Sequence, residues 1–204
     1  MKGVFVTGTD TGIGKTLVSA WLAARWPADY WKPVQSGTDQ DSDADFVAAL
    51  APGCRIHPSA YRLRAPMSPH EAARRDGIRI EMSALSLPAT AGPLVVEGAG
   101  GVLVPLNDEA LMIDLIARLG LPAVVVTGTR LGTINHTLLT LEALRTRGLP
   151  VVGVVIDGDP EPVSRAAITR FGGVPVVADL PRLGVISAAA VAALPAPDFL
   201  ENLP

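Results

Sequence analysis

Short runs of apolar residues alternate along the chain with longer segments in which apolar positions recur at helical spacing. The short runs are almost continuously apolar, which is typical of strands buried on both faces of a sheet. We expect strands at residues 4–7, 30–34, 94–97, 123–127, 151–156 and 174–178. The alternation therefore predicts a three-layer α/β fold, in which helices cover both faces of a mostly parallel sheet.

Helical spacing and helix-start residues predict the covering helices. The spacing indicates helices at residues 16–25, 111–119 and 133–147. A further helix is expected after Ser68, because Ser is a favoured N-cap and Pro69 suits the first helical position. Glu71, at the third helical position, is expected to complete a reciprocal cap with Ser68.

The composition favours one soluble domain that acts on small molecules. At 204 residues with 49% hydrophobic positions, the chain can bury one substantial core, so we expect a single domain over residues 1–204. Its 17 basic and 20 acidic residues are scattered, without the basic stripe of nucleic-acid-binding proteins. No apolar stretch reaches the roughly 18 residues of a membrane helix, so no membrane contact is expected. Cys54 is the only cysteine and no signal-peptide pattern is present, which favours a cytoplasmic location.

The first apolar run leads into the sequence GTDTGIGKT and then into a helical pattern, which is the context of a phosphate-binding P-loop. Gly12 and Gly14 let backbone N–H groups turn toward an anion. Lys15 can reach the β and γ phosphates, and Thr16 offers a hydroxyl to Mg²⁺. The expected nucleotide contacts in this segment are Thr11, Gly12, Ile13, Gly14, Lys15, Thr16 and Leu17.

A P-loop needs a carboxylate near its metal ion, and Glu97 supplies one at the end of a buried apolar run. The glycine-rich segment after it allows close approach to phosphate oxygens. It adds the expected contacts Gly98, Ala99 and Gly100. A second acidic ligand could come from residues 38–66, which show no regular pattern. That segment begins with Asp39, Asp41, Asp43 and Asp45, and the residues alone give no reason to choose among them.

Together these motifs resemble the dethiobiotin synthetase family. The resemblance rests on GTDT at 8–11, GKT at 14–16, KPV at 32–34, SG at 36–37, EGAGG at 97–101, and LG with INH at 131–136. The order of the motifs also agrees, and the resemblance extends to about residue 183. It implies a P-loop NTPase-like fold and a homodimer with composite active sites. The implied activity is ATP-dependent carboxylation and ring closure of 7,8-diaminopelargonate with CO₂ or bicarbonate to dethiobiotin in biotin biosynthesis, through a carbamate and a carbamoyl-phosphate mixed anhydride.

The resemblance also implies roles for individual residues. It selects Asp43 among the aspartates, so that Thr16, Asp43 and Glu97 would hold Mg²⁺. It makes Lys32 and Lys15 the catalytic lysines, although by residue type alone Lys32 could equally be an exposed lysine at a strand end. The implied substrate contacts are Ser36, Thr11 and, serving the neighbouring subunit, Gly132, Thr133, Ile134 and Asn135.

Contacts with the nucleotide base are implied near the last two strands, at Asp157, Gly158, Pro181, Arg182 and Leu183. The chain departs from the family pattern at Gly12, at Arg130 and at Asp157, where the family has Asn. An ionised Asp accepts hydrogen bonds but cannot donate to adenine, so GTP or CTP is expected to replace ATP more readily. Alternatively, Asp157 caps the turn that follows it, for which Asp is also favoured.

Two other functions stay open. One is a P-loop switch ATPase of the partitioning type, which usually carries a second lysine where this loop has Asp10. The other is an amide-forming ligase acting on a cobalamin precursor, which needs an ammonia source. Cys54 lies in no glutaminase context that would supply one. Formation of dethiobiotin from diaminopelargonate separates the three.

Overall fold

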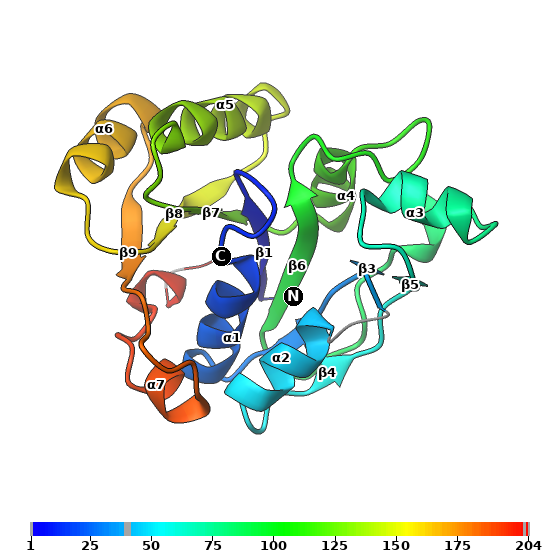
Figure 1. Ribbon diagram of the computed structural model, residues 1–204, viewed down its shortest axis with the longest axis horizontal. Coiled ribbons are helices and arrows are strands. Elements are labelled where there is room, and N and C mark those ends of the chain that lie inside the picture. The colour runs from blue at the N-terminus through cyan, green and yellow to red at the C-terminus, as the bar shows by residue number, and fades with distance from the viewer. Residues whose placement is uncertain (1, 39–41, 202, 204) are drawn as a thin grey trace.

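The computed structural model describes residues 2–38, 42–201 and 203, which fold around a seven-stranded parallel sheet (Figure 1). The strand order is β4-β2-β6-β1-β7-β8-β9. The strands are β1 (Gly3–Gly8), β2 (Asp29–Trp31), β4 (Ile56–His57), β6 (Leu94–Gly101), β7 (Ala123–Thr127), β8 (Val151–Asp157) and β9 (Val176–Leu180). Two further strands, β3 (Val34–Ser36) and β5 (Tyr61–Leu63), pair in parallel as a small second sheet.

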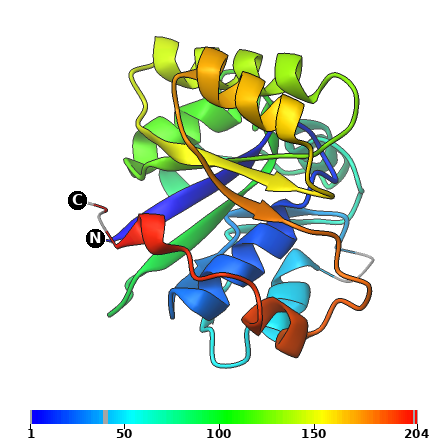
Figure 2. The same cartoon turned by 90° about the vertical axis from the view of Figure 1, so that its left-hand side faces the viewer.

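Helices cover both faces of the large sheet, which gives the expected three layers (Figure 2). One face carries α3 (Pro69–Arg75), α4 (Met112–Leu119), α5 (Thr133–Thr146) and α6 (Pro162–Gly172). The other face carries α1 (Lys15–Arg25), α2 (Asp43–Leu50) and α7 (Ala188–Ala192). Short 3₁₀ helices lie at Met82–Ala84 and Asp198–Leu200. Among the described residues, no helix is both long and apolar enough to cross a membrane.

Successive residues of the central strands contribute to two different cores. In β1, Phe5 packs in the core under α3 to α6, while Val4 and Val6 pack in the core under α1, α2 and α7. Val95 and Val96 divide in the same way in β6. Both faces of the sheet are therefore buried, and this explains why the strands are continuously apolar in sequence.

One expected strand was wrong. Residues 30–34 form parts of two strands, because β2 ends at Trp31 in the large sheet and β3 begins at Val34 in the small one. Pro33 lies between them and has no N–H to donate to a sheet ladder. The break leaves Lys32 outside both strands. It follows the C-terminal end of β2, just as the P-loop follows the C-terminal end of β1.

The region without a clear pattern contains regular structure. Ser42 and Asp45 form a reciprocal cap that starts α2 at Asp43, and β4 and β5 follow. Asp39 and Asp41 lie outside the described residues. The pattern of residues did not predict α6, which begins at Pro162. The α3 helix forms as expected, but the reciprocal cap does not. Ser68 makes no capping hydrogen bond with its side chain, and Glu71 instead pairs with Arg74 and Arg75.

Candidate active site

The loop between β1 and α1 has the geometry of a phosphate cradle. Gly12 and Gly14 have φ angles of 68° and 95°, which glycine adopts without strain. At Gly14 an added Cβ would lie 2.0 Å from a carboxylate oxygen of Asp157, so the position has no room for a side chain. α1 begins directly after the loop, and the free N–H groups of such a helix start favour an anion.

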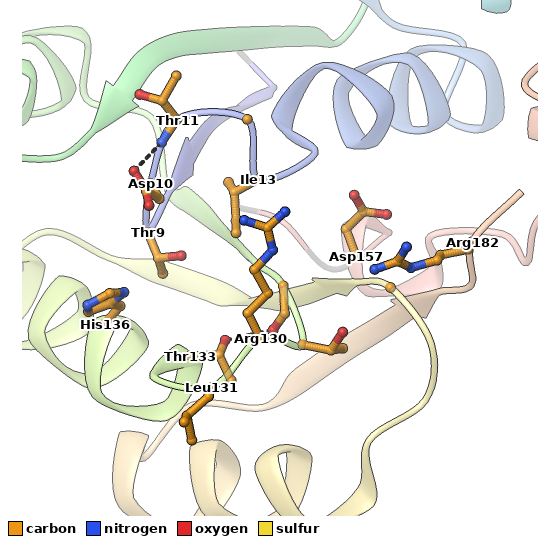
Figure 3. Close-up of a pocket in the computed structure, with 14 residues that line it drawn as sticks. Thr9, Asp10, Thr11, Ile13, Arg130, Leu131, Thr133, His136, Asp157 and Arg182 are labelled. Carbon is orange, nitrogen blue, oxygen red and sulfur yellow. Dashed lines mark hydrogen bonds between the residues drawn. The ribbon is translucent and has the colours of Figure 1, made fainter.

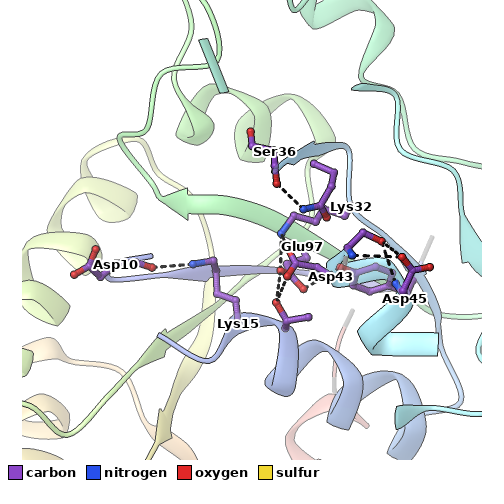
Figure 4. A network of polar contacts seen from close by, with 11 residues as sticks. Asp10, Lys15, Lys32, Ser36, Asp43, Asp45 and Glu97 are labelled. Atoms are coloured by element: carbon purple, nitrogen blue, oxygen red, sulfur yellow. Dashed lines mark hydrogen bonds and ion pairs between the residues drawn. The ribbon is translucent and has the colours of Figure 1, made fainter. Parts of the chain in front are cut away.

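Lys15 is buried at the base of the loop. It is 6% exposed, and its Nζ donates a 2.8 Å hydrogen bond to the carbonyl oxygen of Asp10 (Figure 4). Burial lowers the pKa of Lys15 to about 8, although the negative charge of Glu97 opposes the change. A bound phosphate adds negative charge and so favours the protonated form. Lys15 is therefore well placed to bind an anion.

A buried ionic cluster lies beside the P-loop (Figure 4). The Thr16 hydroxyl lies 3.0 Å from Oδ1 of Asp43 and 3.0 Å from Oε1 of Glu97. The Lys32 ammonium donates to both carboxylates, at 2.8 Å from Oε1 of Glu97 and also to Oδ2 of Asp43. The Tyr30 hydroxyl donates to Oε2 of Glu97 at 3.0 Å. Side chains from four separate segments of the chain thus converge at one point.

Charge and burial together set the protonation states in this cluster. Burial alone would lower the pKa of Lys32, but the charges of Glu97 and Asp43 raise it above its ordinary value. Burial alone would raise the pKa of Asp43, but the charge and hydrogen bond of Lys32 lower it. Burial and the Glu97 charge raise the pKa of Tyr30 well above its usual range, so Tyr30 stays a neutral donor. The cluster is an ammonium held between two carboxylates.

The donor set fits Mg²⁺. The hydroxyl of Thr16 and the carboxylates of Asp43 and Glu97 are hard oxygen donors, and they already meet within hydrogen-bonding distance. Mg²⁺ prefers such oxygens and usually takes its other ligands from water and phosphate. The adjacent P-loop would hold those phosphates. The structure therefore brings together all three expected metal ligands, and their binding of Mg²⁺ stays a prediction.

One cavity of about 730 Å³ joins the P-loop to this cluster. It is lined by most of the residues expected to bind nucleotide, metal and substrate. These are Thr11, Gly12, Ile13, Gly14, Lys15, Thr16, Leu17, Lys32, Ser36, Asp43, Glu97, Ala99, Gly100 and Asp157. Within the described part of the chain, the hydroxyl oxygen of Ser36 is buried without a hydrogen-bond partner. A ligand in this cavity could therefore bond to Ser36.

A second cavity of about 390 Å³ lies along the other side of the P-loop (Figure 3). Its walls include Thr133 at the start of α5, Gly158 after β8 and the guanidinium-bearing residues Arg130 and Arg182. Asp157 lines both cavities. The shared P-loop wall makes the two cavities parts of one extended site.

Six expected contacts lie outside these two cavities: Gly98, Gly132, Ile134, Asn135, Pro181 and Leu183. Gly98 is packed against Phe5, and a Cβ there would lie 2.8 Å from the ring. Asn135 lines a separate groove between α5 and α6. The α5 segment was expected to serve a neighbouring subunit, and that expectation stays a prediction.

Asp157 ends β8 against the P-loop. Its carboxylate lies next to Gly14, and burial raises the pKa of Asp157, opposed by the positive charge of Arg182. Among the described residues, no hydrogen bond from the following turn contributes to that pKa. The carboxylate points toward the site, with Arg182 beside it (Figure 3). This placement favours a ligand contact over the alternative of a turn cap.

Two polar members of the site were missed in the sequence. Tyr30 stands in a segment expected to form a strand, and only the three-dimensional structure shows its hydroxyl donating to Glu97. Gln35 follows the KPV motif, but a single glutamine carries no chemical signature. It is buried and lines the 730 Å³ cavity.

The fold and the site define a P-loop nucleotide-binding protein. A sequence profile described as an AAA domain matches residues 2–190. A ParA family ATPase from Chlorobium tepidum superposes with a TM-score of 0.54, covering 98% of each chain at 11% sequence identity. At that identity the similarity shows a common fold alone.

Sequence relatives define the family more narrowly. The chain is 60% identical over 199 residues to the ATP-dependent dethiobiotin synthetase BioD of Paramagnetospirillum magneticum, covering 98% of this chain and 97% of that protein. It is 50% identical over 200 residues to the protein of the same name from Rhodopseudomonas palustris strain HaA2, covering 97% and 94%. The chain therefore belongs to the dethiobiotin synthetase family, and the resemblance inferred from its motifs is confirmed.

Proposed function

We propose that the chain closes the ureido ring of dethiobiotin from 7,8-diaminopelargonate and CO₂ or bicarbonate, using ATP, as a cytoplasmic step of biotin biosynthesis. The observation that supports this most is the position of Lys32, whose ammonium lies in one cavity with the P-loop, between Asp43 and Glu97. Phosphoryl transfer to an anionic acceptor crowds negative charges together. It therefore needs cations more than a protein nucleophile.

The reaction has three steps. One amine nitrogen bonds to the carbon of CO₂ and loses a proton, which gives a carbamate. A carbamate oxygen then takes the γ-phosphoryl group of ATP, and ADP leaves. The second amine attacks the carbamoyl carbon, phosphate leaves, and loss of a second proton completes the ring. In this scheme Lys15 and Lys32 stabilise the charge on the transferring phosphoryl group.

The remaining side chains of the cavity bind and orient. Thr16, Asp43 and Glu97 would hold Mg²⁺, which neutralises phosphate charge when bound. Ser36 offers a buried, unpartnered hydroxyl to the diamine, and Thr11 lines the same cavity. The backbone N–H groups from Gly12 to Leu17 would hold the triphosphate.

Asp157 and Arg182 are the proposed contacts of the nucleotide base, together with Gly158, Pro181 and Leu183. Asp157 lies at the end of β8 where the P-loop wall is shared by both cavities. An ionised carboxylate there can accept from an exocyclic amine or from guanine's two adjacent donors, but cannot donate to adenine. GTP and CTP are therefore expected to support the reaction alongside ATP.

The active form is proposed to be a homodimer with composite sites. Its support is a group of exposed apolar side chains around the start and outer side of α5: Leu131, Leu139 and, from the segment after β6, Leu103. Leu103 and Leu139 line one shallow pocket with His136. Apolar side chains gathered on a surface are typical of a protein interface. The same region carries Gly132 to Asn135, proposed to bind the substrate carboxylate of the neighbouring subunit.

Incubation of the protein with diaminopelargonate, bicarbonate, Mg²⁺ and ATP tests the proposed reaction. Mass spectrometry should find dethiobiotin, with one ADP and one phosphate formed for each ring. ATP hydrolysis without dethiobiotin, stimulated instead by DNA or by a protein filament, would favour the switch ATPase. An amidated product that requires ammonia would favour the ligase acting on cobalamin precursors.

A further inference from the structure

Gln35 lines the 730 Å³ cavity and has one buried polar atom without a hydrogen-bond partner among the described residues. It is the middle residue of β3 and is 5% exposed. Its Nε2 donates a 2.9 Å hydrogen bond to the carbonyl oxygen of Ser36. Because only the amide nitrogen can donate to a carbonyl, this bond fixes the orientation of the side chain. Oε1 is then the buried oxygen that has no partner among the described residues.

No donor among the described residues satisfies this oxygen. Lys32 directs N–H bonds to Asp43 and Glu97, and the single hydrogen of the Thr16 hydroxyl is shared between the same two carboxylates. The Gln35 amide lies close enough to Asp43 to help lower the pKa of that carboxyl. Its effect is smaller than that of burial, which raises this pKa, and smaller than that of the Lys32 charge, which lowers it. The Gln35 side chain therefore lies beside the reacting cluster, where the protein is rich in acceptors.

A buried acceptor without a donor destabilises the protein. A ligand can remove that penalty only if it brings a donor. The phosphate groups of a nucleotide are acceptors at neutral pH, so the triphosphate is unsuited. The diamine is suited, because its amine and carbamate nitrogens carry N–H bonds.

We propose that Oε1 of Gln35 accepts a hydrogen bond from one of the two reacting nitrogens of the diamine, and so fixes which nitrogen faces the Lys32–Glu97 pair. The inference rests on the proposed function, because it assigns a residue to the substrate of that reaction. Gln35 is then a specificity-determining residue. Its unsatisfied oxygen lowers the stability of the protein without substrate and contributes to substrate affinity.

The test is Gln35→Met, which keeps a similar volume and removes the acceptor. We expect KM for diaminopelargonate to rise about tenfold, which corresponds to about 1.4 kcal/mol. KM for ATP should stay within about twofold, and the melting temperature should be unchanged or higher. The matched control is Ser19→Ala, which removes another buried, unpartnered oxygen in α1, away from both cavities. It should leave both KM values unchanged.

Binding of monoamine analogues identifies the nitrogen and does not depend on turnover. Isothermal titration of wild type and Gln35→Met with 7-aminopelargonate and with 8-aminopelargonate should give a difference of about tenfold for one analogue and none for the other. If Gln35→Met proves unstable, the same comparison in Gln35→Leu takes its place.

Three results would overturn the inference. The first is an unchanged KM for the diamine in an active Gln35→Met enzyme. The second is a raised Mg²⁺ requirement with normal diamine affinity, which would place a metal-bound water against Oε1. The third is a melting temperature lowered by several degrees in both Gln35→Met and Gln35→Leu, which would give Gln35 a purely structural role. In each case wild-type enzyme that still forms dethiobiotin leaves the proposed function intact.

Discussion

Replacing Lys32 by alanine separates its contribution to folding from its contribution to chemistry. The substitution leaves Glu97, which is fully buried, and Asp43, whose side chain is 34% exposed, without their shared counter-charge. Removing one partner of a buried ion pair costs about 3–5 kcal/mol. Because Asp43 is partly solvated, we expect the lower end of that range, about 3 kcal/mol.

This loss converts into a measurable change in melting temperature. For chains of 150–250 residues, each kcal/mol lowers the melting temperature by about 2–4 °C, so Lys32→Ala should melt about 6–12 °C below wild type. Mg²⁺ can supply the missing positive charge to the two carboxylates. Adding Mg²⁺ should therefore raise the melting temperature of the variant more than that of wild type.

The chemical contribution appears in turnover. We expect Lys32→Ala to bind nucleotide within about threefold of wild type but to lose at least about 100-fold in kcat, or about 2.7 kcal/mol of transition-state stabilisation. Lys32→Arg is the control, because it keeps the charge but changes the geometry. It should recover most of the stability and little of the turnover. Near-normal turnover in Lys32→Ala, or an unchanged melting temperature, would refute the assigned position of this lysine.

Three further predictions concern the base contact, the P-loop lysine and the dimer. Asp157→Asn should raise the preference for ATP, whereas wild type should use GTP and CTP within about tenfold of ATP. The measurement is kcat/KM for the three nucleotides, and a strong ATP preference in both proteins would contradict a base contact by Asp157. Because the pKa of Lys15 is lowered to about 8, the lysine loses its charge as the pH rises through that value, so kcat/KM for ATP should fall above about pH 8. A profile flat to pH 10 is incompatible with that pKa. Leu139→Asp should shift the protein toward monomer in light scattering and raise KM for the diamine, whereas Val163→Asp, at an exposed position of α6, should change neither. A fully active monomer would exclude composite sites.

Much of the fold could be predicted because the central strands are buried on both faces. A strand of that kind is apolar at nearly every position, so it can be recognised from its own sequence without knowing which strands lie beside it. The failure at residues 30–34 has a specific cause. Apolar residues stand at both ends of the segment, which reads YWKPV, while Pro33 ended one ladder and allowed Val34 to join another sheet. Sheet membership is a long-range property that local periodicity does not encode.

The site was predictable to the extent that a motif fixes its own geometry. The P-loop does so, because its glycines and Lys15 act within one turn. The choice of Asp43 had a usable signal: the Ser42–Asp45 cap starts α2 and makes Asp43 the first residue of the helix. Tyr30 and Gln35 had none. Tyr30 matters because its hydroxyl donates to Glu97, 67 positions away in the chain. Gln35 matters because its Oε1 lacks a partner among the described residues.

The pairing of Lys32 with two carboxylates also protects the enzyme from its own substrate. CO₂ reacts with neutral amines and not with ammonium ions, and the proposed reaction brings CO₂ close to this lysine. Glu97 and Asp43 raise the pKa of Lys32 despite its burial. Lys32 is thus held as an ammonium ion at neutral pH. The diamine can thus be carboxylated beside a lysine that is itself inert toward CO₂.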